Sequence, residues 1–230
     1  MRRILFLVIF GLAGAGILIA LGVWQVQRLA WKEGVLAEIG ARISDPPVAI
    51  PADPTPDADR YLPVRATGEI GADEIHVLVS IKRVGPGYRI IAPMALTDGR
   101  RILLDRGFVP TEDKDRPRQT GPADVAGNLH WPRETDSYTP APDLATNTWF
   151  ARDVPAMADA LGTDPILLIA GRGAKTDPSV TPLPVDTAGI PNDHLQYAIT
   201  WFSLALIWLA MTAYFLWRTR STSSAQPKAM

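Results

Sequence analysis

The chain contains no cysteine and only three histidines among its 230 residues. The absence of cysteine excludes disulfide bonds, iron–sulfur clusters, cysteine-ligated zinc and thiol nucleophiles. The histidines, His76, His130 and His194, are far apart and show none of the short spacings of histidine metal sites. A catalytic triad or a hydrolase metal site would need residues gathered from dispersed positions. We therefore predict that the protein is not an enzyme.

Acidic residues are absent from both ends of the chain. All 24 of them lie between Glu33 and Asp193, and the segment from Arg28 to Asp193 that contains them holds 18 Lys and Arg residues. The basic residues outside this segment, Arg2, Arg3, Arg218, Arg220 and Lys228, have no acidic neighbours. Because basic flanks stay in the cytoplasm, we expect cytoplasmic termini and a translocated middle of about 170 residues. No basic face stands out, so nucleic acid is not an expected partner.

Two uncharged apolar segments are long enough to cross a membrane, at about 20 residues each. They are Ile4 to Trp24 and Leu195 to Trp217. Five of the seven tryptophans lie in or just after these segments, as expected for residues that prefer membrane interfaces. A signal peptide is the alternative for the first segment. Its apolar run is too long for that, and no small-residue cleavage site follows it.

The first segment is rich in small residues, namely Gly11, Gly14, Ala15, Gly16 and Ala20. Such residues allow two membrane helices to approach closely. We expect the partner to be the second segment or a neighbouring protein. Apolar spacing continues through Leu29, Leu36 and Ile39, which predicts that the first helix extends into the aqueous phase.

The segment from Ser44 to Asp59 contains five prolines and is predicted to be an extended linker, with neither helix nor central strand. Beyond it the pattern changes to strands and turns. Val84–Gly87 and Thr97–Gly99 are expected turns, the second with the Asp-Gly signal of a hairpin. Charged Glu112–Gln119 is an expected exposed loop. The predicted strands are 61–68, 74–83, 88–96, 100–108, 123–131, 147–151 and 165–170.

One soluble helix is expected after Asp153, a plausible N-cap, and before Gly162, with Met157, Ala160 and Leu161 as its buried side. The fold class that follows is a membrane protein. Its two transmembrane α-helices flank an α+β, mainly antiparallel β exterior domain, whose core includes Trp131 and Trp149. The predicted divisions are a cytoplasmic N-terminus 1–3, a transmembrane helix 4–24, a helical extension and Pro-rich linker 25–59, the exterior domain 60–191, a second transmembrane helix 192–217 and a disordered cytoplasmic tail 218–230.

A histidine stands at the head of the second apolar segment. Helical spacing places His194, Trp201 and Trp208 on one face, with Tyr197, Ala198 and Ala205 beside them. An imidazole above an aromatic stripe at a membrane edge is suited to ligate a flat apolar cofactor. The alternative is a histidine that hydrogen-bonds a loop or a lipid headgroup. If it is a ligand, Asn192 and Asp193 are candidates to hold its other ring nitrogen.

The outer end of the first segment should lie level with His194. Trp24, Gln25 and Arg28 lie there, and a guanidinium pairs well with carboxylates, so Arg28 could hold an anionic group of the cofactor. Lys32, one turn on, is a weaker candidate for the same role, and the alternative for Arg28 is contact with lipid headgroups. Arg106 is expected to form a cross-strand ion pair, with contact to a partner protein as the alternative.

Ordered motifs along the chain resemble those of one known family. They are residues 22–32 (GVWQVQRLAWK), Gly85-Pro86-Gly87-Tyr88 with Pro93, 98–100 through 105–110 (DGR, DRGFVP), 131–134 (WPRE), 147–153 (NTWFARD) and the stretch around His194. Together they resemble the Surfeit-locus family of cytochrome c oxidase assembly factors, the Surf1-like proteins. The resemblance covers nearly the whole chain. Asp193 stands where the family commonly has an asparagine, which changes the expected hydrogen bonding near His194.

The resemblance implies a non-enzymatic factor of the respiratory chain. It would bind haem a, with its iron ligated by His194, and help to insert it into oxidase subunit I. Trp201, Tyr197, Arg28, Trp24 and Gln25 would then line the haem site. The implied location is the bacterial inner membrane, with the central domain in the periplasm. One alternative is a scaffold for oxidase subunits or haem synthase that does not bind haem, and another is a membrane-anchored receptor or sensor.

Overall fold

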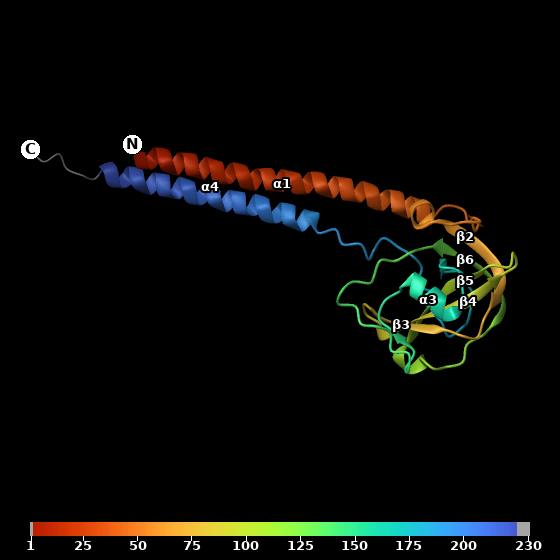
Figure 1. Ribbon diagram of the computed structural model, residues 1–230. Coiled ribbons are helices and arrows are strands. Elements are labelled where there is room, and N and C mark those ends of the chain that lie inside the picture. The colour runs from red at the N-terminus through yellow and green to blue at the C-terminus, as the bar shows by residue number, and fades with distance from the viewer. Residues whose placement is uncertain (1, 225–230) are drawn as a thin grey trace, which may run out of the picture. The chain divides into compact units, whose positions relative to one another are not determined.

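The computed structural model describes residues 2–224 of the chain (Figure 1). Met1 and residues 225–230, which include the end of the expected cytoplasmic tail, lie outside that part. The chain forms two compact units. One consists of residues up to Glu38 together with those from Ala188 onward, and the other of Ile39–Thr187.

The first unit is a pair of antiparallel helices. Helix α1 runs from Arg2 to Ile43 and helix α4 from His194 to Ser224. The extension predicted beyond Trp24 is therefore confirmed. The tail predicted to be disordered from Arg218 is wrong as far as Ser224, because α4 continues to that residue. Both helices contain segments long and apolar enough to cross a membrane.

Small residues bring the two helices together, as their spacing predicted. Gly11 and Gly22 of α1 are buried, and Ala15 is 3% exposed. A Cβ atom added at Gly14 would lie 2.6 Å from the Trp208 ring, and one at Gly22 would lie 2.7 Å from Phe202. The Trp208 indole N–H donates to the Gly11 carbonyl at 3.0 Å, so its polar atom is satisfied inside the pair. The partner of the first apolar segment is therefore the second.

The linker between Ser44 and Asp59 is more structured than its prolines predicted. Strand β1, Val48–Ala49, pairs parallel with the edge of the sheet. Helix α2 is one turn long, Pro56–Asp59, with Thr55 as its N-cap. The expectation of no helix is wrong here, because proline is well tolerated in the first turn, where its missing N–H has no partner to lose.

The second unit is built on one sheet whose strands agree with the predicted positions to within a few residues. Three strands are shorter than predicted, β3, β7 and β8. The strands are β2 Pro63–Ile70, β3 Ile75–Ile81, β4 Gly85–Leu96, β5 Arg101–Pro110, β6 Gly121–Leu129, β7 Thr148–Trp149 and β8 Leu167–Ala170. The sheet order is β1-β2-β6-β8-β5-β4-β3-β7, and an additional β2–β4 pairing closes it into a barrel. Most pairings are antiparallel, but β1–β2, β3–β7 and β5–β8 are parallel.

Alternating side chains of the barrel strands divide the core into two layers. On β5, Ile102 and Leu104 point into the barrel, and Leu103 points to an outer layer. Helix α3, Val154–Leu161, covers that outer layer with Met157, and Trp149 packs there too. Trp131 is half-buried and touches both layers, so both predicted core tryptophans are confirmed.

The ends of α3 are as predicted, and so is its buried side at Met157 and Leu161, but not at Ala160. Asp153 accepts a hydrogen bond from the Ala156 N–H at 3.2 Å, and Gly162 ends the helix with φ of 62°. Met157 is buried, whereas Ala160 is exposed and Ala158 takes its place. Val154, Met157 and Ala158 stand at positions i, i+3 and i+4 of the helix. They therefore share the face that packs against the barrel.

One predicted turn is confirmed and the other is displaced. The Asp98-Gly99 turn joins β4 to β5, with φ of 92° at Gly99. The turn predicted at Val84–Gly87 lies instead at Lys82–Val84, and Gly85 already begins β4. Arg83 adopts φ of 70°, the left-handed conformation that the turn needs. The sequence indicates glycine as the turn residue, but Gly85 pairs with Ile81 of β3 and belongs to the strand.

Candidate functional site

The candidate site lies in the helix pair, where the side chain of His194 meets α1. Helix α4 begins at His194, and the Asp193 carbonyl accepts the first helical hydrogen bond from the Tyr197 N–H at 3.1 Å. The His194 Nδ1 atom lies 2.8 Å from Oε1 of Gln25. Gln25 is only 8% exposed. The outer end of the first apolar segment is therefore level with His194, as predicted.

This contact determines the tautomer of His194. An amide oxygen can only accept a hydrogen bond, so Nδ1 carries the proton and donates it to Gln25. The neutral ring then keeps the lone pair of Nε2 for a ligand. Among the side-chain hydrogen bonds of the described residues, this is the one that His194 forms. A histidine that ligates iron or zinc through one nitrogen usually donates the other N–H to a protein oxygen in this way.

Gln25, and neither Asn192 nor Asp193, holds the second nitrogen of His194. This outcome corrects the expectation from sequence neighbours. The backbone carbonyl of Asp193 caps the helix, as described above, and the Asn192 Oδ1 atom is buried without a hydrogen-bond partner. The helix start directs the ring across to α1, which sequence proximity did not reveal.

The face predicted on α4 is the face that packs against α1. Ala198 and Ala205 are each 3% exposed. His194, Trp201 and Trp208 are half-buried along the same stripe. Their spacing of seven residues keeps them on one side over about two turns each.

The remaining predicted residues flank that face. Trp24 is 53% exposed and Tyr197 is 54% exposed. The Arg28 guanidinium stacks on the Trp31 ring, with its carbon 3.9 Å from the ring centroid. Stacking uses the flat surface of the guanidinium and leaves its N–H edge available to a carboxylate. The structure brings Gln25 to His194, and it places Trp24, Arg28 and Tyr197 beside this contact.

An apolar groove between the helices was not predicted from the sequence. It has a volume of about 350 Å³, and we call it the helix-pair groove. Its lining residues are Gly14, Ile17, Leu18, Leu204, Ile207, Trp208 and Met211. A signal was present, since Leu204 and Met211 follow Tyr197 at intervals of seven residues. The missing information was that the Trp208 ring packs on Gly14, with the groove beside this contact.

Arg106 in the barrel unit is neither exposed nor in a cross-strand ion pair, so both predictions for it are wrong. Ile90 pairs with Gly107 and Ile91 with Asp105, which makes Arg106 the extra residue of a β-bulge. Arg106 is 1% exposed and donates 2.8 Å hydrogen bonds to the carbonyls of Gln119 and Thr176. Burial lowers its pKa from the ordinary arginine value.

The charged loop after β5 is likewise less exposed than predicted. The Arg118 side chain is 2% exposed and forms an ion pair with Glu74. The same carboxylate accepts a hydrogen bond at 2.9 Å from His76, which is buried. Glu74 thus holds two buried side chains at the start of β3, while Nδ1 of His76 and Nε of Arg118 are buried without a hydrogen-bond partner.

His130 is packed rather than ligating, as expected. Its ring stacks on Tyr61 with centroids 5.1 Å apart. Burial lowers the pKa of His130 to about 4, and the charges of Arg152 and Arg60 act in the same direction. Across the described part of the chain, no group of three or more His, Cys, Asp or Glu side chains is placed to bind a metal ion.

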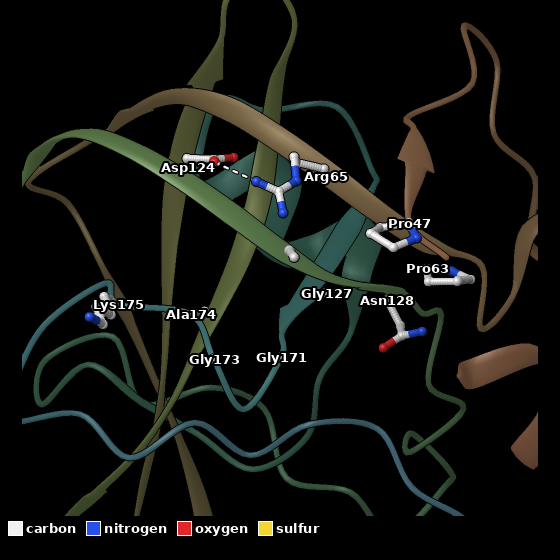
Figure 2. Close-up of a pocket in the computed structure, with 11 residues that line it drawn as sticks. Pro47, Pro63, Arg65, Asp124, Gly127, Asn128, Gly171, Gly173, Ala174 and Lys175 are labelled. Atoms are coloured by element: carbon white, nitrogen blue, oxygen red, sulfur yellow. Dashed lines mark hydrogen bonds and ion pairs between the residues drawn. The ribbon is translucent and has the colours of Figure 1, made fainter. Parts of the chain in front are cut away.

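A larger cavity on the barrel surface, about 510 Å³, is lined by polar and glycine residues. Figure 2 shows Arg65 and Asp124 facing each other across β2 and β6, and their side chains form an ion pair at 2.7 Å. Gly127 and Gly171 form part of its wall. The cavity is open to solvent, and the Arg65 guanidinium in its lining is already paired with Asp124. It is therefore a weaker candidate for a binding site than the His194 contact, although its volume is larger.

Comparison with known proteins gives a consistent result. The model of the SURF1 family matches residues 12–206. Surfeit locus protein 1 of Xenopus tropicalis is 30% identical over 222 residues, covering 86% of this chain and 70% of that protein. The human protein of the same name is also 30% identical, over 221 residues, with 86% and 71% covered. A SURF1-like protein of Rickettsia conorii is 29% identical over 214 residues, with 89% and 88% covered.

Proposed function

Because the chain belongs to the SURF1 family, we propose that it is an assembly factor for haem–copper cytochrome c oxidase. It binds haem a through His194 and helps to insert it into subunit I of the oxidase. The observation that carries this proposal is the hydrogen bond from His194 to Gln25. That bond prepares one imidazole nitrogen to serve as an axial ligand.

The residues around His194 fit a haem in chemistry as well as in position. Nε2 supplies the iron ligand, and Gln25 orients the ring from the buried side. Arg28 supplies a guanidinium edge for a propionate. Trp201 and Tyr197 offer aromatic surface to the macrocycle. Gln25 is thus a positioning residue in this proposal, whereas the sequence alone suggested a direct contact.

Delivery requires binding that is firm but reversible. A single histidine ligand on one helix satisfies that need, and His194 is the one histidine in the sequence of this unit. The haem is cargo here, and the protein contributes its orientation and its release. Subunit I is the recipient, and haem a synthase is a further partner of the proposed pathway.

The proposed location is the bacterial inner membrane. Helices α1 and α4 each contain a candidate span, Ile4–Ile43 and His194–Arg220. Their exposed surfaces carry large apolar side chains, which supports contact with lipid. The distribution of charge supports cytoplasmic termini and a periplasmic barrel unit. His194 then lies near the periplasmic surface of the membrane.

The test is to produce the full chain together with the enzymes that make haem a, purify it in detergent, and record its optical spectrum. Wild type should carry haem a, and His194→Ala should lose it. Gln196→Ala, an exposed neighbour on the same helix, is the matched control and should retain it. Gln25→Ala should weaken haem binding by about tenfold, the usual effect of removing the partner of a ligating histidine.

Two results would overturn this mechanism. One is a wild-type protein that carries no haem, and the other is a His194→Ala variant that carries as much as wild type. Crosslinking of haem-free wild type to oxidase subunits or to haem synthase, combined with either result, would establish the scaffold function in its place.

A further inference from the structure

The helix-pair groove lies in line with the residues of the His194 site. On α4, Tyr197, Leu204 and Met211 are spaced by seven residues, so they form one stripe along the helix. Leu204 and Met211 line the groove, and Tyr197 stands beside His194. The stripe therefore leads from the haem-binding end of α4 into the groove.

Helix α1 shows the same continuity on the opposite wall. Gly14 and Arg28 are fourteen residues apart, and Ile17 and Trp24 are seven apart. Both intervals keep residues on one side of a helix. Gly14 and Ile17 line the groove, and Arg28 and Trp24 flank the contact between Gln25 and His194. The groove and the proposed haem site thus open on the same side of the helix pair.

The distance between them suits a ligand that reaches from one to the other. Leu18 lies seven residues from Gln25 and Gly14 lies eleven, which correspond to about 10 Å and about 16 Å along the helix. The groove therefore begins within reach of a substituent on a macrocycle held at His194.

The groove offers apolar surface and no free polar group. The Trp208 N–H is bonded to the Gly11 carbonyl at 3.0 Å. The nearby Thr212 hydroxyl donates to the Trp208 carbonyl at 2.8 Å. No charged residue lines it. Its chemistry suits an uncharged hydrocarbon chain, whose charged or polar end must be bound elsewhere.

We propose that the helix-pair groove holds the hydroxyethylfarnesyl chain of the haem whose iron His194 ligates. This assignment rests on the proposed function and adds a physical basis for selecting haem a over haem b. Haem a carries this isoprenoid chain, whereas haem b has a vinyl group at that position. A free phospholipid could insert an acyl chain into the groove, but only the haem chain is continuous with a group bound at His194 and Arg28.

The test compares haem o with haem b, because haem o differs from haem b only in the farnesyl chain. Both are titrated into the full-length protein in detergent, and binding is followed by the change in the Soret band. Wild type should bind haem o about tenfold more tightly, a modest gain because detergent already shields the free chain from water. In Leu204→Trp, which fills the groove, this preference should fall to about twofold or less. Its affinity for haem b should stay at the wild-type level.

Leu206→Trp is the matched control. Leu206 is 70% exposed, does not line the groove and should keep the wild-type preference. If Leu204→Trp does not fold, Ile17→Trp on the other wall, with Leu12→Trp as its control, gives the same comparison. Equal affinity of wild type for both haems would overturn the groove assignment. So would an equal effect of the groove variant and its control.

The same titration separates failure of the groove assignment from failure of the proposed function. If neither haem gives a Soret change that depends on His194, the proposed function fails. If haem b binds through His194 but haem o has no advantage, only the groove assignment fails. Native mass spectrometry would then show whether a phospholipid retained by wild type is lost in Leu204→Trp, which would assign the groove to an acyl chain.

Discussion

The barrel unit and the helix pair bury polar groups in opposite ways. In the barrel, Asp105 is fully buried and its carboxylate contacts two arginines and a backbone N–H. Arg106 is buried against carbonyl oxygens. In the helix pair, Gln25 is the one buried polar side chain among the described residues. Its hydrogen bond uses one nitrogen of His194 and leaves the other available.

The buried polar groups of the barrel therefore stabilise the fold, whereas those of the helix pair are suited to bind a ligand. A buried charge must be paired, because desolvation without a partner is very costly. The barrel meets that requirement internally, so its buried charges have little capacity left for a ligand. In the helix pair, the half-buried imidazole of His194 keeps the lone pair of one nitrogen available, and a ligand can bind there. The buried charged residues therefore lie in the barrel unit, whereas the candidate site lies in the helix pair.

The largest expected effect is in the barrel. Asp105→Ala leaves Arg89, 2.6 Å away, and Arg152, 3.6 Å away, without this carboxylate. We expect a loss of about 3–5 kcal/mol in the free energy of unfolding, because Arg89 loses its carboxylate partner and Arg152 keeps only Glu134. Urea unfolding of the full chain in detergent, followed by circular dichroism, measures it.

Asp124→Ala is the matched control for Asp105→Ala. It removes an equally short ion pair with Arg65, but these side chains are 50% and 59% exposed. Its cost should stay below about 1 kcal/mol. Similar costs for the two variants would contradict the contrast between buried and exposed pairs, and a small cost for Asp105→Ala would contradict the structural role of the buried network.

A smaller effect is expected from overpacking the helix pair. A Cβ atom at Gly14 would lie 2.6 Å from the Trp208 ring, whereas nothing lies within 4 Å of one at Gly16. Gly14→Leu should force α1 and α4 apart at a cost of about 1–3 kcal/mol. Gly16→Leu should leave the pair unchanged. The comparison therefore tests whether close approach, rather than apolar content, holds these helices together.

Cysteines at the buried positions Ala15 and Ala205 provide the measurement, since the chain has no cysteine of its own. Oxidative crosslinking between them should fall several-fold in Gly14→Leu and stay constant in Gly16→Leu. Equal crosslinking in both variants would show that the helices do not pack through Gly14.

The smallest effect is the pH dependence contributed by His130. Its pKa is about 4 in the folded protein and 6.5 for the ordinary side chain. As the pH falls from 6.5 to 4, the unfolded chain takes up the proton first, so stability that is present above pH 6.5 is lost across this window. The loss between pH 7 and pH 5 is about 1 kcal/mol once partial solvent exposure is allowed for.

His130→Phe keeps the aromatic contact with Tyr61 and removes the titrating group. Urea unfolding at pH 7 and pH 5 should show a smaller acid-induced loss for this variant than for wild type. If both lose stability equally, another group causes the acid sensitivity of the barrel unit.

The elements of the fold were largely predictable because they depend on local pattern. The Asp98-Gly99 turn and the ends of α3 follow from residue type at single positions. The turn after β3 was misplaced because pairing of Gly85–Gly87 with β3 overrides their turn preference. Arg106 was misjudged because a bulge, which no local pattern announces, turns its side chain into the interior.

For the candidate site, the sequence by itself determined the helix and its face. Apolar length and charge distribution identify α1 and α4, and spacing by seven residues places His194, Trp201 and Trp208 together. Only the tertiary structure decided that Gln25 holds His194 and that a groove lies beside the contact of Gly14 with Trp208. The physical reason is that helical periodicity is a property of one segment. Hydrogen bonding and close packing between α1 and α4 depend on which residues of these two distant segments lie opposite one another in the helix pair.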